Sequence, residues 1–188
     1  MQTTKSTLLQ KFGHNRKLRA QVCNQRERLY RIAWSWCHDQ HLADDLVQET
    51  QAKALEKLDS LREESRLAVW LTRIMANIYR DHFRKNREET GLEIDVAIED
   101  ETPELSTDRM QLVQRTRDAI ASLSDDQRQI ISLVDLASFS YADTAKILDI
   151  PVGTVMSRLS RARNKLRERL ERPIYHTKQK VVPIRKPS

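Results

Sequence analysis

The stretch from Ser138 to Arg172 restricts the fold more than any other part of the chain. Ser140, followed three residues later by Asp143, is a capping-box pattern that predicts the start of a short helix. Asp149-Ile150-Pro151 predicts the end of that helix. The proline suits the first position of a second helix, where its missing N–H has no intrahelical partner. Two short helices separated by a tight turn predict a helix-turn-helix.

The second of these helices has two contrasting faces. Apolar residues recur at helical spacing and are predicted to form one buried stripe: Val152, Val155, Leu159, Ala162, Leu166 and Leu170. The opposite face is polar or cationic and consists of Thr154, Ser157, Arg158, Arg161 and Lys165. Such a face suits a helix that lies in the major groove of DNA with phosphates on either side. The alternative is a solvated basic face, but the helix that comes before it favours DNA binding.

The composition favours an all-α protein with two small helical domains. Among 188 residues there are 3 glycines, 32% of the residues are charged, and long β-branched runs are absent. The net charge is +7 over residues 1–87, −8 over residues 88–106 and +7 over residues 107–188. Two basic blocks around an acidic strip indicate polyanionic partners.

These blocks also predict how the chain is organised. The expected parts are a flexible N-terminus (1–15), a first helical domain (16–87), a flexible acidic linker (88–106), a second helical domain (107–172) and a flexible basic tail (173–188). Within the second domain, Ser124 and Gln127 form another capping box. No signal segment or membrane-length apolar run is found, so we expect a cytoplasmic protein whose Cys23 and Cys37 are reduced and buried.

The helix predicted from Leu67 to Arg87 carries the second sign of nucleic-acid binding. Polar, mostly cationic side chains share one of its faces at helical spacing: Arg73, Asn77, Arg80, Arg84 and Arg87. Tyr79 and Phe83 border that face. Aromatic rings beside cations are able to stack bases while the cations hold phosphates.

Two helices are predicted before it, from Arg16 to Trp36 and from Leu42 to Leu58. The second has a polar face formed by Asp45, Gln48 and Glu49, which by itself indicates only a solvated surface.

The segment between these helices contains the residue types that bind metals: His38, His41, Asp44 and Asp45. The segment lies across one helix end and the next helix start, where the aspartates would complement the helix dipole. We therefore expect neither a metal site nor a cofactor.

Together these segments resemble the bacterial RNA polymerase sigma factors of the sigma-70 family, in the extracytoplasmic-function (ECF) group that keeps only regions 2 and 4. The region 2 motifs are DLVQET at Asp45–Thr50 and VWLTRIMANIYRDHFRKNR at Val69–Arg87. The region 4 motif, LSDDQRQIISLVDLASFSYADTAKILDIPVGTVMSRLSRARNKLRERL, occupies Leu123–Leu170. The resemblance covers residues 16–172, with the two motifs in the family's order and an acidic linker between them.

The resemblance implies three functional surfaces. The surface that docks on the β′ coiled coil of core RNA polymerase would contain Asp45, Gln48 and Glu49. The surface that binds the −10 promoter element, including a loop that captures a flipped base, would contain Leu61, Arg62, Glu63, Glu64, Ser65, Arg73, Asn77, Arg80 and Arg84. The −35 element would be bound by Thr154, Ser157, Arg158, Arg161 and Lys165.

The implied partners are core RNA polymerase, through its β′ and β subunits, promoter DNA, and an anti-sigma factor that could hold the chain at a membrane. No catalytic residue, cofactor or small-molecule substrate is implied. The chain departs from the family pattern at Gln51, where Phe is common, and at Glu63-Glu64, where Gly-Asp is commoner. Met156 and Ser160 stand where some members carry Arg and Phe, so the promoter sequence does not transfer from a relative.

Two other functions are open at this point. A stand-alone helix-turn-helix regulator would bind a palindromic operator as a dimer, and neither the tail nor the linker offers it an obvious apolar dimerisation surface. A helical enzyme would need a convergent acid or metal cluster, for which the segment from His38 to Asp45 is the one candidate.

Overall fold

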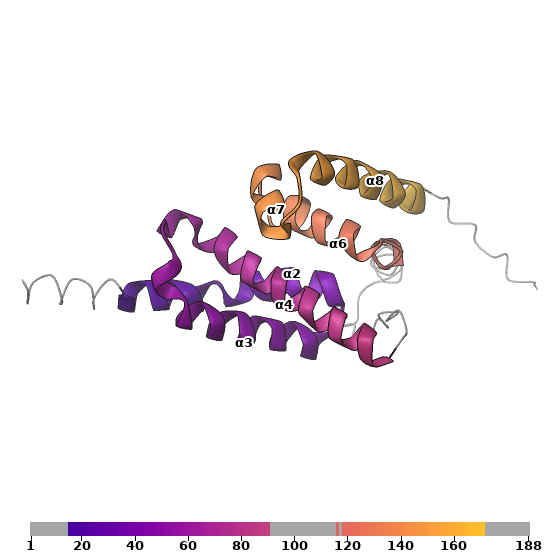
Figure 1. Cartoon of the computed structure of the whole chain (residues 1–188). Coiled ribbons are helices and arrows are strands. Elements are labelled where there is room, and N and C mark those ends of the chain that lie inside the picture. The colour runs from indigo at the N-terminus through magenta and orange to yellow at the C-terminus, as the bar shows by residue number, and fades with distance from the viewer. Residues whose placement is uncertain (1–14, 91–115, 117, 172–188) are drawn as a thin grey trace, which may run out of the picture.

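The structure, a computed structural model, describes residues 15–90, 116 and 118–171, and these residues form helices without strands (Figure 1). The prediction of an all-α fold is confirmed. Residues 15–24 and 118–121 are also helical. Of the segments predicted to be flexible, residues 1–14, 91–106 and 173–188 lie outside the described part of the chain. The named elements are α2 (Arg26–Cys37), α3 (Gln40–Glu56), η1 (Leu58–Ser60), η2 (Glu64–Arg66), α4 (Leu67–Thr90), α6 (Asp125–Ile131), η3 (Ser132–Leu136), α7 (Tyr141–Leu148) and α8 (Val152–Glu171).

The first predicted helix is divided by a turn at Gln25, so that residues 15–24 and α2 are separate helices. The side chain of Gln51 on α3 explains how the break is stabilised. Its Nε2 donates hydrogen bonds to the carbonyl oxygens of Val22 at 3.2 Å and Cys23 at 3.4 Å. These carbonyls belong to the last turn of the first helix, which lacks the regular i+4 amide donors, and the Val22 oxygen also accepts a hydrogen bond from the Gln25 N–H at 3.2 Å.

α3 begins two residues earlier than predicted, because Asp39 caps it. The Asp39 side chain accepts a hydrogen bond from the backbone N–H of Leu42 at 3.0 Å. Asp44 and Asp45 therefore lie beyond the first turn, and the role predicted for them as partners of the helix dipole was wrong.

The two capping signals of the second half are confirmed, whereas the position predicted for Pro151 was wrong. Ser124 and Gln127 form the capping box at the start of α6, and the backbone N–H of Asp143 donates to Ser140 Oγ at 3.0 Å at the start of α7. Pro151 stands one residue before α8, not at its first position. Asp149, in the left-handed conformation with φ 58°, ends α7 and produces the turn of the helix-turn-helix.

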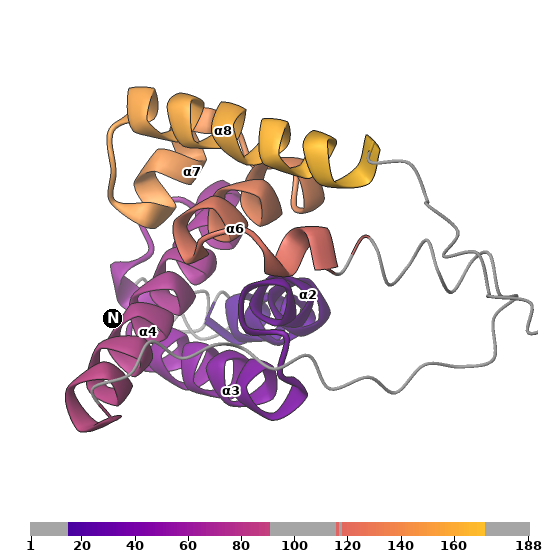
Figure 2. The ribbon, with the colours of Figure 1, turned by 90° about the vertical axis from the view of Figure 1, so that its right-hand side faces the viewer.

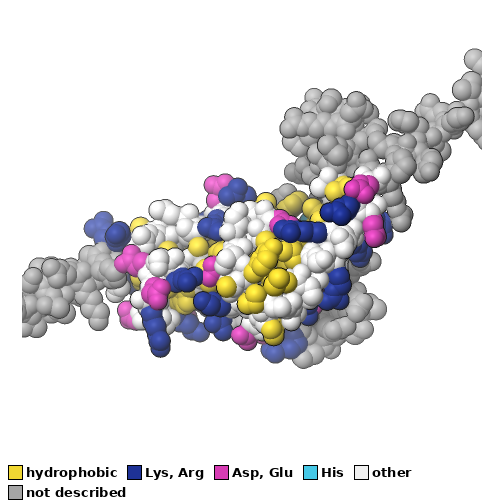
Figure 3. Space-filling view, turned by 90° about the horizontal axis from the view of Figure 1, so that it is seen from above, with side chains coloured by type: hydrophobic (Ala, Val, Ile, Leu, Met, Phe, Trp, Pro, Cys, Tyr) yellow, Lys and Arg dark blue, Asp and Glu magenta, His cyan; other side chains and the backbone are white. Residues whose placement is uncertain are grey.

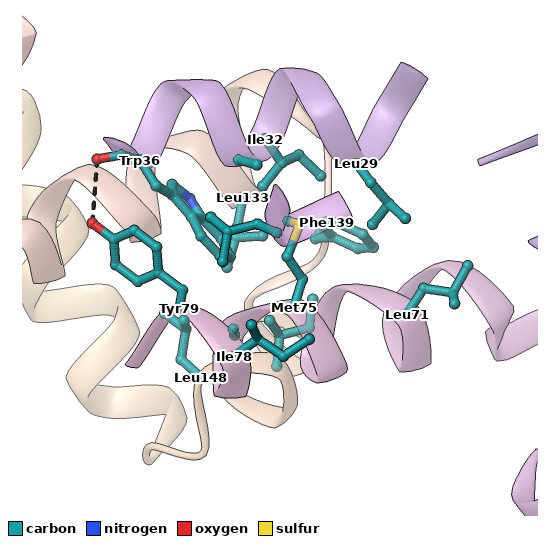
Figure 4. Packing of buried hydrophobic residues seen from close by; sticks show 14 of the residues in the cluster. Leu29, Ile32, Trp36, Leu71, Met75, Ile78, Tyr79, Leu133, Phe139 and Leu148 are labelled. Atoms are coloured by element: carbon teal, nitrogen blue, oxygen red, sulfur yellow. Dashed lines mark hydrogen bonds between the residues drawn. The ribbon is translucent and has the colours of Figure 1, made fainter. Parts of the chain in front are cut away.

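The two halves of the chain share one hydrophobic core. Its buried members include residues of the helix over residues 15–24, α2, α3 and α4 in the first half and of α6, η3, α7 and α8 in the second. Leu133 and Phe139 point into the space between α2 and α4, next to Met75, and Leu148 lies beside Ile78 (Figure 4). The structure is therefore closed: the helix-turn-helix packs directly against the first helical bundle.

Polar contacts cross the same boundary. Arg128 on α6 is 6% exposed and donates through Nη1 to the carbonyl oxygen of Trp36 at 2.9 Å. The same carbonyl accepts a hydrogen bond from Tyr79 Oη at 3.3 Å. Arg28 donates to the carbonyl oxygen of Ala137 at 2.8 Å. The hydrogen bonds of Arg128 and Arg28 therefore join the two halves across the hydrophobic interface.

The closure is one-sided. α6 and α7 contact α2 and α4, whereas α3 packs against α2 and α4 from the other side (Figures 1 and 2). α7 and α8 lie at the top of Figure 1 and α3 at the bottom. The outer face of α3 is therefore remote from the helix-turn-helix.

Phe139→Ser should separate the two halves. The ring is 7% exposed, and the Arg28 guanidinium lies 4.7 Å from its centroid. Removing a buried aromatic side chain costs about 3–5 kcal/mol, here at the boundary between the halves. We expect a larger radius of gyration in small-angle X-ray scattering with the far-ultraviolet circular dichroism retained.

Leu136→Ser is the matched control, because Leu136 is 57% exposed in the same segment and should change neither measurement. A Phe139→Ser protein with the wild-type radius would contradict the shared core.

Candidate nucleic-acid interface

The predicted polar face of α4 is exposed. Leu71, Met75 and Ile78 are buried and fix the orientation of the helix, which turns Arg73, Asn77, Arg80 and Arg84 to the surface. Arg80 donates through Nη2 to Asn77 Oδ1 at 2.5 Å, and Arg84 pairs with Asp81 at 3.2 Å. These contacts join neighbours on one helix and leave the side chains at the surface, where exposed ion pairs are weak.

Tyr79 does not belong to this face. It is 2% exposed, and burial raises its pKa well above the usual tyrosine range. Its ring packs against Trp36 at a centroid distance of 5.3 Å. The prediction that Tyr79 borders a base-stacking surface was wrong, because Trp36 covers it. Phe83 is partly exposed and contacts Tyr79.

The loop from Leu61 to Ser65 precedes α4, and Arg62, Glu63, Glu64 and Ser65 are exposed there while Leu61 is partly buried. Next to this loop, Arg66 bonds Asp143 of α7 at 2.7 Å. Arg73 pairs with Asp149, at the end of α7, at 3.6 Å. Two acidic residues of the helix-turn-helix thus form ion pairs with two arginines, one next to α4 and one on its polar face. Sequence reasoning missed this pairing because no local pattern connects the two halves.

α8 is held by three buried residues, Val155, Leu159 and Ala162, while Leu166 is partly buried. Two residues predicted in the same stripe are exposed instead: Val152 at 41% and Leu170 at 38%. The stripe prediction was therefore wrong at both ends of the helix.

The five residues of α8 predicted to contact DNA divide into two groups. Ser157 and Arg161 are exposed, and Thr154 is partly exposed. Arg158 forms an ion pair with Asp126 at 2.8 Å, and Lys165 Nζ donates to the carbonyl oxygen of Ser122. The DNA contacts of Arg158 and Lys165 stay predictions, and both side chains hold α8 against α6 and the turn before it.

The other flank of α8 is held by Arg163, which bonds both carboxylate oxygens of Asp135 on η3. This hydrogen bonding raises the pKa of the Arg163 guanidinium above its usual value. Seen from above, hydrophobic side chains gather over α7 and the start of α8, with basic side chains around them (Figure 3). The exposed large apolar residues of these two helices include Tyr141, Val152 and Met156.

The polar face of α3 is exposed as well. Asp45, Gln48 and Glu49 lie at positions that share one side of the helix, and Glu49 pairs with Lys53 at 2.7 Å. Since α3 is remote from the helix-turn-helix, closure leaves this side accessible.

The segment from His38 to Asp45 is explained by structural contacts. Asp39 caps α3, and Asp44 pairs with Arg26 at 2.7 Å. Among the described residues, no group of three or more His, Cys, Asp or Glu could hold a metal ion. Both cysteines are free thiols, and burial raises the pKa of the Cys37 thiol to about 11. Cys23 is exposed, so the prediction that it is buried was wrong. No helix in the described ranges is long and apolar enough to span a bilayer.

Comparison with known proteins agrees with this architecture. Residues 24–89 match Sigma-70 region 2, and residues 114–166 match Sigma-70, region 4. The ECF RNA polymerase sigma factor EcfG of Rhodopseudomonas palustris is 39% identical over 128 residues, which cover 66% of this chain and 68% of that protein. The ECF RNA polymerase sigma factor SigW of Bacillus subtilis is 28% identical over 157 residues, 77% of this chain and 84% of that protein.

Two solved structures are similar. One is the sigma factor RpoE in complex with the anti-sigma factor NepR from Bartonella quintana, with a TM-score of 0.67 and 36% identity over 80% of this chain and 94% of that one. The other is CnrH in complex with the cytosolic domain of CnrY, with a TM-score of 0.57 and 25% identity over 82% of this chain and 95% of that one.

A region 2 bundle followed by a region 4 helix-turn-helix defines a sigma factor of the sigma-70 type. The chain belongs to the ECF RNA polymerase sigma factors. Its function is that of an alternative sigma factor, which directs promoter-specific initiation of transcription, and the stand-alone regulator is not favoured.

Arg158→Ala and Asp126→Asn should lower the melting temperature by similar amounts that do not add in the double variant. The pair is partly exposed, so we expect a coupling of about 0.5–1 kcal/mol. Thermal unfolding of the two single variants and the double variant measures it. Additive effects would show that Arg158 does not hold α8 through Asp126.

Proposed function

We propose that the chain uses three surfaces with separate tasks. α3 docks on the β′ coiled coil of core RNA polymerase through Asp45, Gln48 and Glu49. α4 and the loop from Leu61 to Ser65 bind the −10 element, and α8 binds the −35 element. The supporting observation is that α3, α4 and α8 all keep polar, exposed faces, while each packs through other, apolar residues into the core. Region 2 would correspond to residues 16–87 and region 4 to residues 107–172.

The closed arrangement defines the state of the free chain in this proposal. Asp143 of the helix-turn-helix forms an ion pair with Arg66, which lies beside the −10 surface, and Asp149 forms one with Arg73, which lies on it. Promoter elements in this family lie about one and a half duplex turns apart, which is about 50 Å. Halves that share one core cannot reach both elements at once, so core polymerase has to separate them. The free chain would then bind promoter duplex weakly.

In this role the chain does no covalent chemistry, since the polymerase supplies the catalytic site. It acts in the cytoplasm, where core polymerase and promoter DNA are, and the polymerase β subunit is a second contact. Two similar structures are complexes with NepR and with a domain of CnrY, and the first is named as an anti-sigma factor. We infer that an anti-sigma factor also binds this chain.

Reversing the charge of the docking surface should weaken binding to core polymerase. Asp45→Lys with Glu49→Lys replaces two exposed carboxylates on one side of α3 without touching the core. We expect at least a tenfold loss of affinity for core polymerase, measured by fluorescence anisotropy, with unchanged circular dichroism.

The matched control is Glu27→Lys with Glu168→Lys, which makes the same charge change at exposed positions outside α3. Equal affinity of the two double variants for core polymerase would refute the assignment.

Replacing Asn77 and replacing Arg84 should change promoter binding in different ways. An amide offers a donor and an acceptor to a base edge, whereas a guanidinium far from bases offers charge to phosphate. Asn77→Ala holoenzyme should change its −10 sequence preference in a competition between promoter variants. Arg84→Ala should weaken binding evenly and reduce its salt dependence. The same sequence profile for Asn77→Ala and wild type would exclude base reading by Asn77.

A further inference from the structure

The start of α8 exposes apolar side chains that the fold does not use. Met156 is 54% exposed and Val152 is 41% exposed, one helical turn apart, whereas Val155 between them is fully buried. Val152 and Met156 therefore stand outside the core, beside the polar Ser157. The other side of α8 already packs against the core through Val155, Leu159 and Ala162. Apolar groups that remain exposed on such a helix indicate an external partner.

The contacts of α8 determine which side is outward. Arg158 ties one flank to α6 through Asp126, and Arg163 ties the other to η3 through Asp135. On the surface between these two flanks, the first turns of the helix expose Val152, Gly153, Met156 and Ser157. In a helix-turn-helix, the N-terminal residues of the second helix contact base edges.

Gly153 provides an independent observation. A Cβ atom at this position would meet no atom within 4 Å, and the residue is exposed. The fold therefore does not require glycine here, although glycine destabilises a helix relative to alanine. A missing side chain lets the helix backbone approach another molecule closely, next to the two apolar groups.

The charge around these residues identifies the kind of molecule. From Val152 to Arg167, α8 contains no acidic residue and five basic ones. Arg161 and Arg167 are exposed. Such a surface complements a polyanion and repels another basic surface. Duplex DNA is a polyanion that also displays apolar groups, the C5-methyl groups of thymine, in its major groove.

We propose that Val152, Gly153 and Met156 form a surface that reads thymine methyl groups in the −35 duplex. Hydrogen-bonding side chains such as Ser157 and Arg161 do not detect a methyl group, while a thioether and an isopropyl group gain by burying it. Because Gly153 has no side chain, the helix backbone is able to approach the bases closely enough for that contact. The inference rests on the proposed binding of α8 to the −35 element and adds the residues that discriminate thymine there.

The test uses holoenzyme reconstituted from core polymerase and this chain. A −35 sequence is first selected from a randomised promoter library, and each thymine of its two strands is then replaced by uracil, which lacks only the methyl group. Burial of one methyl group is worth about fourfold in affinity, or about 0.8 kcal/mol. We expect at least one uracil substitution to reduce wild-type promoter binding about fourfold, and Met156→Ala holoenzyme to lose that sensitivity. Met156→Leu should keep it.

Two further variants sharpen the experiment. Gly153→Ala should fold as well as wild type and weaken promoter binding, because the added Cβ meets no protein atom but keeps the helix from the bases. Leu136→Ser, an exposed apolar residue outside α8, should leave the response to uracil unchanged.

Wild-type binding that no uracil substitution changes, or an equal uracil effect in Met156→Ala, would overturn the inference while the proposed function stands. A Met156→Ala chain that keeps its uracil response but loses affinity for core polymerase or an anti-sigma factor would show that the patch is a protein-binding surface. If the library yields no −35 preference at all, the proposed role of α8 fails and this inference fails with it.

Discussion

The carbonyl oxygen of Trp36 joins three helices that are far apart in the sequence. It lies at the end of α2, where carbonyl groups lack intrahelical donors, and it accepts hydrogen bonds from Tyr79 on α4 and Arg128 on α6. Arg128 also donates to the carbonyl oxygen of Leu123 and lies 3.3 Å from Asp125. A buried guanidinium without such partners would cost several kcal/mol, so the closed arrangement has few alternative registers.

Local patterns predicted the parts of the fold that local interactions decide. The capping boxes at Ser124 and Ser140 and the polar face of α4 were predictable, because each depends on residues that lie close together along one helix. The break at Gln25 was not, since the donor that stabilises it is Gln51 on another helix. Tyr79 was misplaced for the same reason: spacing puts it beside the cationic face, and Trp36 decides that it is buried.

The candidate site followed the same division. Exposure of the polar faces of α3 and α8 was predictable, because the buried residues of each helix recur at helical spacing. Which exposed residues have intramolecular partners was not predictable. Asp126 pairs with Arg158 of α8, and the Ser122 carbonyl accepts a hydrogen bond from Lys165. Asp149 pairs with Arg73 of α4, and each of these contacts joins residues far apart in the sequence. An apolar stripe shows that a helix packs against something, but it does not show which element is the neighbour. The core shared by the two halves could therefore not be predicted from the sequence.

The remote position of α3 gives the closed state a thermodynamic consequence. Its outer face is accessible in closed and open chains alike, so contact with it alone leaves the balance between them unchanged. A ligand shifts that balance only through surfaces that differ between the two states. If one chain in about a hundred is open, every open-state complex is weakened about a hundredfold, or about 2.7 kcal/mol. Residues such as Leu133, which are buried in the shared core, would then set how well this chain competes for a limited pool of polymerase.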